Sequence, residues 1–236
     1  MIVPNATGDS SVARPSDTVS HFLECMYYIT EVDEVIRPSR LAAWLGIKAP
    51  TVTDTVRRLV RDGWVHVNGD RSLRLTAKGE EVGASIVRRH RILERWLVDV
   101  LGFDWATADV EAEGLAATVS EEVIDRIDRS LGSPVTCPHG NAIPGRSPHY
   151  GTLVALSNIA RGERVSVRRV SEVAEHEAHS LLSNLGLMGI AEGTRIRVVS
   201  IADDKLSMNV LIGRQRHIIS MPDADLIWVE RGSADA

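Results

Sequence analysis

The stretch SRLAAWLGIKAPTVTDTVRRLVRDGW, residues 39–64, carries the pattern that decides the fold of the first part of the chain. Ser39, which follows Pro38, predicts the cap of a short helix, and Gly46 predicts its end. Pro50 is suited to the first turn of a second helix. The buried stripe of that second helix is expected to consist of Val52, Val56, Leu59 and Val60. Two short helices joined at a glycine in this way are typical of a helix-turn-helix.

Directly after this stretch, WVHVNGDRSLRLT (residues 64–76) holds two runs of alternating apolar residues. The runs flank Asn68–Gly69, a pair that favours a tight hairpin turn, and Arg71 lies at the expected tip. A hairpin that follows a helix-turn-helix is a wing. The sequence therefore predicts a winged helix-turn-helix domain over residues 17–76, preceded by a disordered tail over residues 1–16.

The charge of this region indicates a nucleic acid partner, although the whole chain has a net charge of −5. Between Arg37 and Arg95 there are 13 Lys or Arg residues and six Asp or Glu residues. A basic region on an acidic chain is typical of proteins that bind duplex DNA, and it disfavours an ordinary helical domain with a solvated charged face. The residues expected to contact double-stranded DNA are Arg40, Lys48, Pro50, Thr51, Thr53, Asp54, Arg57, Arg58 and Arg71.

The remainder of the chain changes character twice. Residues 77–135 have strong helical periodicity, and residues 136–150 fall in a segment rich in Pro and Gly, which predicts a linker. Residues 151–230 contain short alternating apolar runs, which predict a small β-barrel-like domain interrupted by one helical stretch at about 172–187. The expected fold class is therefore α+β.

Composition and sequence patterns indicate the cellular compartment in which such a protein is expected. The 236 residues are 44% hydrophobic, which is enough for at least one core, and no apolar run has the length of a membrane span. The first residues have neither the basic nor the apolar region of a signal peptide. Cys25 and Cys137 do not resemble a disulfide framework, so a reducing cytoplasm is expected.

Three predicted helices each carry a pair of side chains that are able to bind a metal ion. The pairs are His21 with Glu24, His90 with Glu94, and Asp109 with Glu113. Residues three or four positions apart share one helix face, and imidazole and carboxylate donors suit Mn²⁺, Fe²⁺, Zn²⁺ or Co²⁺. A single pair of this kind is more often a solvated surface, so spacing alone is a weak indication of a metal site.

The order of the segments is more specific than any one of them. The winged helix-turn-helix is followed by VRRHRILERWLVDVLG (87–102), VEAEGLAATVSEEVIDRI (110–127), CPHGNAIPG (137–145) and a β-rich tail. Over roughly residues 18–230 this order resembles the diphtheria toxin repressor family, which includes iron-dependent repressors and manganese transport regulators. The tail, with NLGLMGIAEGTRIRVV (184–199), is similar to the SH3-like domain shared with ferrous-iron transport protein A.

The resemblance implies an α+β protein with an N-terminal winged helix-turn-helix, a helical dimerisation and metal-sensing domain, and a C-terminal SH3-like small β-barrel. It implies a repressor of metal homeostasis genes that responds to Mn(II) or Fe(II). Such a repressor binds a palindromic operator as a homodimer and has no membrane partner.

The family pattern also implies two metal sites that share His90. The primary site is expected to contain His21, Glu24, His90 and Glu113. The ancillary site is expected to contain His90, Glu94 and Asp109, with Glu172, Glu175 and His176 as donors from the tail. A Glu–His pair that the family uses as primary ligands is Ala116–Ala117 in this chain. Either the reduced primary site works, or the ancillary site works alone, or metal sensing has been lost.

Three other interpretations stay open. Cys137 and His139 have the spacing of half a zinc site, but the resemblance favours a connecting loop there. A regulator that has lost metal sensing is the main alternative function. A metalloenzyme using His90, Glu94 and Glu113 is more distant, because the sequence has no H-E-x-x-H motif and no obvious general base.

Overall fold

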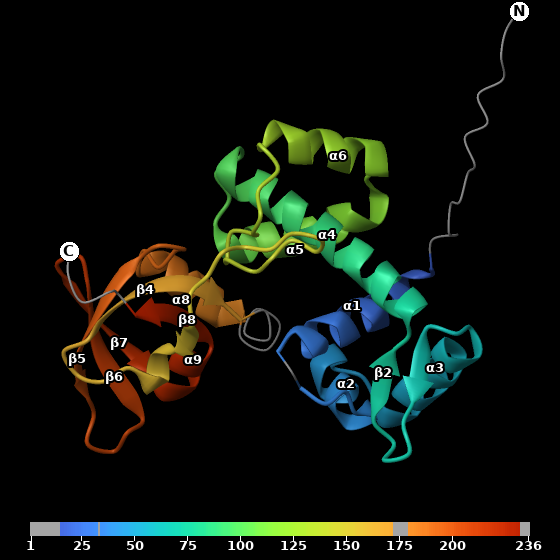
Figure 1. Ribbon diagram of the computed structural model, residues 1–236, viewed down its shortest axis with the longest axis horizontal. Coiled ribbons are helices and arrows are strands. Elements are labelled where there is room, and N and C mark those ends of the chain that lie inside the picture. The colour runs from blue at the N-terminus through green and yellow to red at the C-terminus, as the bar shows by residue number, and fades with distance from the viewer. Residues whose placement is uncertain (1–14, 33, 172–178, 232–236) are drawn as a thin grey trace, which may run out of the picture.

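The computed structural model describes residues 15–32, 34–171 and 179–231, and its α+β architecture agrees with the sequence expectation (Figure 1). Pro15 and Ser16 are the only described residues of the predicted N-terminal tail. Three hydrophobic cores divide these residues into a DNA-binding-type helical unit, a central helical unit and a C-terminal β-domain. None of the helices in the described ranges has the length and apolar character needed to cross a membrane.

The first unit contains three helices and a hairpin. They are α1 (Asp17–Glu31), α2 (Pro38–Leu45), α3 (Ala49–Arg61), β1 (Val65–Val67) and β2 (Leu73–Leu75). β1 and β2 pair antiparallel, with Val65 opposite Leu75, and form the expected wing. Gly46 ends α2 with φ of 61°, a left-handed conformation that glycine adopts without strain.

Two details of this unit differ from the sequence expectation. Ser39 lies inside α2, whose N-cap is Arg37, so Ser39 is not the capping residue. The buried face of α3 consists of Val52, Thr55, Val56 and Leu59. Val60 is 39% exposed, because the helix rotates that position to the edge of the buried face.

The central unit contains α4 (Ala77–Asp99), α5 (Trp105–Thr118) and α6 (Glu121–Ser130). Thr76 caps α4 by accepting a hydrogen bond from the Gly79 backbone N–H, and Ser120 caps α6 in the same way. Figure 1 shows α4 leading from the wing to the other two helices. The core between them contains Ile92, Leu93, Leu97, Ala108, Ala112 and Ile124.

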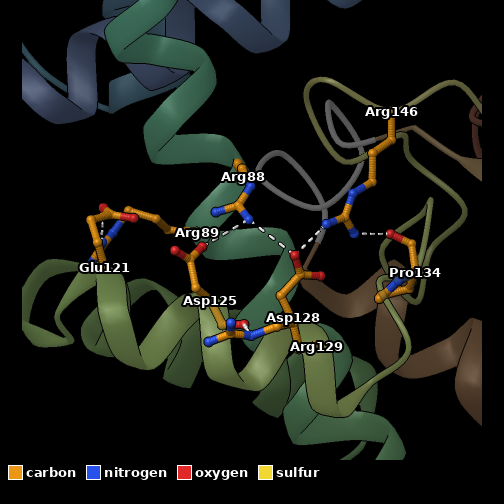
Figure 2. A network of polar contacts seen from close by, with 8 residues as sticks. All are labelled: Arg88, Arg89, Glu121, Asp125, Asp128, Arg129, Pro134 and Arg146. Carbon is orange, nitrogen blue, oxygen red and sulfur yellow. Dashed lines mark hydrogen bonds and ion pairs between the residues drawn. The ribbon is translucent and has the colours of Figure 1, made fainter.

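Arginines on α4 hold α6 in place (Figure 2). Arg88 contacts Asp125 at 3.2 Å and the buried Asp128 at 3.1 Å, and Asp128 also accepts a hydrogen bond from Arg146. Arg89 pairs with Glu121 at the start of α6. One oxygen of Asp128, Oδ2, therefore accepts from guanidinium groups of two different segments, which lowers the cost of burying this carboxylate.

In the described residues, the β-domain has a six-stranded antiparallel sheet, two helices and one 3₁₀ turn. Its elements are β3 (Leu153–Ala155), η1 (Leu156–Asn158), β4 (Arg164–Val170), α8 (His179–Leu187), β5 (Arg195–Ile201), β6 (Ser207–Ile212), β7 (Gln215–Ser220), α9 (Met221–Asp225) and β8 (Ile227–Arg231). The strand order is β3-β8-β4-β5-β6-β7. Strands β4 and β5 both contain irregular pairings, which let the sheet curve around its core.

The segment expected to be a linker packs tightly instead. Thr136 bridges Ala142, and Cys137 and Asn141 close a short hairpin through a 2.8 Å backbone hydrogen bond. We call residues 136–142 the ligand hairpin. Its Cys137 and His139 are 0% and 1% exposed, so this Pro-containing segment belongs to the folded body of the protein.

The start of α4 tolerates no side chain at Gly79. A Cβ there would lie 2.1 Å from the Trp64 carbonyl oxygen, whereas a Cβ at Gly114 in α5 meets nothing within 4 Å. Gly79→Ala should therefore destabilise the protein by about 1–3 kcal/mol, as overpacking does. Gly114→Ala should stabilise it by about 0.5–1 kcal/mol. Denaturant unfolding of both variants is the measurement, and equal stabilities would contradict this packing.

Candidate metal centre

One carboxylate lies at the centre of the candidate site. Glu94 on α4 is 0% exposed, and its Oε1 atom lies 3.6 Å from His90 Nε2. The same His90 atom lies 3.3 Å from Asp109 Oδ1 on α5. The donor atoms of these three residues are all within 4.8 Å of one another. The structure therefore brings together the three helical residues predicted for the ancillary site.

The ligand hairpin adds a second group of donors around the same carboxylate. His139 Nδ1 lies 3.4 Å from Glu94 Oε1, and Cys137 Sγ lies 3.8 Å from His139 Nδ1. Glu94, Cys137 and His139 again place their donor atoms within 4.8 Å of one another. The alternative interpretation of Cys137 and His139, as part of a metal site, is therefore compatible with their positions, and whether they bind a metal ion stays a prediction. We call the five residues His90, Glu94, Asp109, Cys137 and His139 the buried centre.

The buried centre fits a divalent cation. Neither carboxylate oxygen of Glu94 makes a hydrogen bond with any residue that the structure describes, and both are shielded from solvent. A buried carboxylate without hydrogen bonds is costly unless a positive charge lies beside it. Imidazole, carboxylate and thiol groups are the donors that Fe²⁺, Zn²⁺ and related ions use in proteins.

The residues predicted for the primary site line a neighbouring cavity of about 220 Å³. His21 and Glu24 come from α1, His90 from α4 and Glu113 from α5. His21 Nε2 lies 2.8 Å from Glu113 Oε1, so these two side chains already join α1 to α5. Ala116 and Ala117 also line the cavity, and their short side chains offer it no donor atoms.

The electrostatics of the two sites differ. Burial alone would lower the pKa of His90, but Glu94, Asp109 and Glu24 outweigh it and raise that pKa well above its usual value. Burial raises the pKa of Glu24 in the cavity. The hydrogen bond between His21 and Glu113 raises the pKa of His21 and lowers the pKa of Glu113. The carboxylates around His90, which borders both sites, therefore favour the protonated form of its imidazole.

Glu172, Glu175 and His176, the donors predicted from the tail, lie outside the described residues. Their part in the ancillary site stays a prediction. The sequence interpretation also missed the position of Cys137 and His139 next to Glu94. Their C-x-H spacing was the available signal, but spacing does not reveal a partner 43 positions away.

Several residues predicted to contact DNA lie on the exposed face of α3 or on the wing. Pro50, Thr51, Thr53, Asp54, Arg57 and Arg58 are exposed on α3, Lys48 is exposed just before it, and Arg71 is exposed on the wing. Arg57 is paired with Asp54 at 3.2 Å. Arg40 is only partly exposed, bonds Glu34 at 2.8 Å and lies over the Trp44 ring, so its role is at least partly structural.

Part of the basic run is engaged in ion pairs within the protein. Arg89 and Arg91 are buried, whereas Arg88 and Arg95 are partly exposed and pair with exposed carboxylates. Arg91 is 0% exposed and donates to Glu31 at the end of α1 and to the Ala142 carbonyl oxygen in the ligand hairpin. The charge excess counted from sequence is therefore larger than the charge available to a nucleic acid.

Three family models match the chain. "Iron dependent repressor, N-terminal DNA binding domain" matches residues 16–73, and "Iron dependent repressor, metal binding and dimerisation domain" matches residues 76–145. "FeoA domain" matches residues 154–231. Each model falls on one of the three units that the hydrophobic cores define.

Individual proteins with these domains are also similar. The iron-dependent repressor IdeR of Mycobacterium tuberculosis is 35% identical over 193 residues, covering 77% of this chain and 84% of that protein. The diphtheria toxin repressor of Corynebacterium diphtheriae is 36% identical over 192 residues, covering 78% and 84%. A manganese-dependent transcriptional repressor solved in complex with manganese has a TM-score of 0.79 and 29% identity, covering 90% of this chain and 99% of that one. The repressor ScaR with bound Cd²⁺ has a TM-score of 0.73 and 26% identity, with the same coverage.

Metal binding at His90 should release a proton at neutral pH. The raised pKa of His90 keeps the imidazole protonated in the metal-free protein, and a metal ion binds only the neutral ring. The affinity for Mn²⁺ should therefore fall as the pH decreases, beginning at a pH above 6.5. Calorimetric titrations in two buffers of different ionisation enthalpy measure the number of protons released.

The variant His66→Ala is the control for this titration, because His66 is exposed on the wing, away from both sites. It should release as many protons as the parent protein. Identical heats in the two buffers at pH 7 would mean that His90 is already neutral without metal, which contradicts the charge assignment.

Proposed function

Because this chain belongs to the iron-dependent repressor family, whose members are metal-dependent DNA-binding repressors, we propose that it represses metal homeostasis genes when Fe(II) or Mn(II) is bound at the buried centre. Proteins of this family are transcriptional repressors and not enzymes. A divalent metal ion is the signal to which the repressor responds, and the response is operator binding by α3 and the wing. Such a repressor acts on the chromosome, in the cytoplasm.

The observation that carries the proposal is the unsatisfied carboxylate of Glu94. Its two oxygens are buried and make no hydrogen bond within the described residues, while histidine and cysteine donors converge on it. His90 Nε2 lies 3.6 Å from this carboxyl group, which is one of the groups that raise the pKa of His90. A bound divalent ion would supply two positive charges in the same place, which explains why the residues converge there.

The donor types favour Fe(II) over Mn(II) at the buried centre. A thiol from Cys137 is a softer ligand than the carboxylates and imidazoles of the cavity. The cavity around His21 and Glu113 has only nitrogen and oxygen donors and lacks side-chain donors at Ala116 and Ala117. We therefore assign the main response to the buried centre and a weaker, secondary role to the cavity.

The chain's own contacts offer a route from the buried centre to the DNA-binding unit. Arg91 follows His90 directly on α4 and bonds Glu31, the last residue of α1. Its guanidinium group also lies over the ring of Tyr28 on α1, 5.6 Å from the ring centroid. α1 packs against α2, which precedes the recognition helix. A change in the position of α4 near His90 would therefore shift α1 and, with it, the direction of α3.

A palindromic operator requires two recognition helices, and the central unit offers a surface for a second copy. Val100, Leu101, Phe103, Val110 and Val123 are large apolar residues that are 36–58% exposed. They lie on or beside α4, α5 and α6, within residues 76–145, which match the dimerisation domain. We propose that this surface is the homodimer interface and that the dimer binds two half-sites related by a two-fold axis.

Removing a ligand of the buried centre should abolish metal-dependent operator binding. Glu94→Gln and Cys137→Ser should each weaken Fe²⁺ binding at least tenfold, since loss of even an outer-shell partner of a metal ligand costs about 10–100-fold. His21→Ala should have a smaller effect. Electrophoretic mobility shifts with chelator and with excess Fe²⁺ under anaerobic conditions provide the measurement.

The variant Cys25→Ser is the matched control, because Cys25 is a buried cysteine in the first unit and belongs to neither site. It should respond to metal like the parent. If the parent protein binds operator equally with chelator and with Fe²⁺ or Mn²⁺, the regulator that has lost metal sensing is the better description.

The DNA interface is tested on the exposed arginines of α3. Arg58 is exposed, so Arg58→Gln should weaken binding to all DNA sequences. It should also reduce the log–log salt slope by about 0.9 for each phosphate that the protein no longer neutralises. Arg214→Gln, at an exposed position of the β-domain, should change neither quantity. If Arg58→Gln binds DNA with the affinity and the salt slope of the parent protein, Arg58 does not contact DNA.

A further inference from the structure

The ligand hairpin is held from two sides. On the α4 side, Arg95 donates to the Cys137 carbonyl oxygen at 3.2 Å, and Arg91 donates to the Ala142 carbonyl oxygen. On the other side, the end of β4 in the β-domain forms main-chain contacts with it. The Val170 N–H donates to the His139 carbonyl oxygen at 2.8 Å, and Asn141 Nδ2 donates to the Val170 carbonyl oxygen at 2.9 Å.

The approach of the hairpin to β4 leaves no space between them. Gly140 has φ of +84°, and a Cβ at this position would lie 1.9 Å from the Arg168 carbonyl oxygen. Tyr150, which leads into the β-domain, donates to the Gly140 carbonyl oxygen at 2.7 Å. The backbone that carries His139 is therefore fixed by the β-domain.

A side chain from α5 completes the enclosure of His139. Trp105, the first residue of α5, lies edge-on to the His139 ring, with a centroid distance of 4.7 Å and an interplanar angle of 80°. The same indole packs against the hydrophobic core of the β-domain, and α5 contacts α8 there. Figure 1 shows the β-domain next to the central helices on this side.

Trp105 is therefore in contact with a predicted metal ligand on one side and with the β-domain on the other. An edge-to-face ring contact stabilises one orientation of the imidazole. In this orientation His139 Nδ1 points to Glu94, at 3.4 Å. Residues that hold a ligating histidine in place contribute to metal affinity without touching the metal.

We propose that Trp105 is a positioning residue for His139, through which docking of the β-domain and metal binding at the buried centre stabilise each other. The inference rests on the proposed function, because it takes the buried centre as the metal site. Reciprocity follows from linkage: if docking strengthens metal binding, metal binding strengthens docking by the same factor. The β-domain is in this way part of the metal sensor.

The first test needs no metal. Hydrogen exchange of the Val170 amide reports the hydrogen bond to the His139 carbonyl oxygen in the full-length, metal-free protein. Trp105→Ala should speed this exchange about tenfold or more, and Trp105→Phe, which keeps an aromatic edge, should restore most of the protection. Trp64→Ala, which removes an indole from the first unit, should leave the exchange unchanged.

The second test uses Co²⁺ as a spectroscopic probe. A thiolate-to-cobalt absorption band reports the bond to Cys137, and its titration gives the affinity of the buried centre. Trp105→Ala should weaken Co²⁺ binding about 10–100-fold, with Trp105→Phe close to the parent protein. In the parent, Co²⁺ should also slow exchange of the Val170 amide, a measurement that does not depend on any variant folding.

The outcomes separate the two proposals. A parent protein without the thiolate band overturns the proposed metal centre, and the positioning role falls with it. If the parent protein shows the band but its Val170 amide exchanges at the same rate with and without Co²⁺, only the proposed role of Trp105 is overturned. The role of Trp105 is also overturned if the parent shows the band and Trp105→Ala binds Co²⁺ as tightly as the parent.

Discussion

The carboxylate of Glu94 imposes the constraint on which the centre of this molecule depends. Burying a carboxyl group at 0% exposure with no hydrogen bond to any residue in the described ranges is costly unless cationic or metal-binding groups lie beside it. His90 comes from the same helix, Asp109 from α5, and Cys137 and His139 from the ligand hairpin. Three separate segments therefore meet at one buried point, and the packing of the central unit against the β-domain is organised around that point.

The same point is connected to the DNA-binding unit through neighbouring residues of α4. His90 borders both the buried centre and the cavity, and the next residue, Arg91, bonds α1 and the ligand hairpin together. The preceding arginines of α4, Arg88 and Arg89, bind α6, which belongs to the proposed dimer surface. A single helix thus contacts the candidate metal donors, the first helix of the winged unit and the helix that we propose to face a second copy. In the mechanism that we propose, a local change in charge would alter the spacing of the two recognition helices of the dimer.

The two candidate sites differ in which metal-binding side chains of the family pattern they retain. The cavity retains His21, Glu24 and Glu113 but has alanine at 116 and 117, so a metal ion there would have fewer protein donors. The buried centre has a thiol in addition to imidazole and carboxylate groups. A soft donor and a dry environment favour tighter binding of Fe(II)-like ions, whereas the open cavity favours weaker, oxygen-rich binding. The different roles that we propose for the two sites follow from these donor sets.

Local patterns in the sequence determined the helices, the wing, the end of α2 at Gly46 and the cap of α4 at Thr76, though not the start of α2, because helix periodicity, Gly46, Thr76 and the Asn68–Gly69 turn act over a few residues. The order of segments also identified the repressor family, which the comparisons confirm. Tertiary structure alone decided that Cys137 and His139 face Glu94, because the contact joins residues far apart in sequence through a hairpin whose composition predicts a linker. It also decided that Arg88, Arg89 and Arg91 pair with carboxylates on other helices, α1 and α6. Charge counting cannot distinguish a solvated arginine from a buried one, since only the fold sets which carboxylate lies within reach.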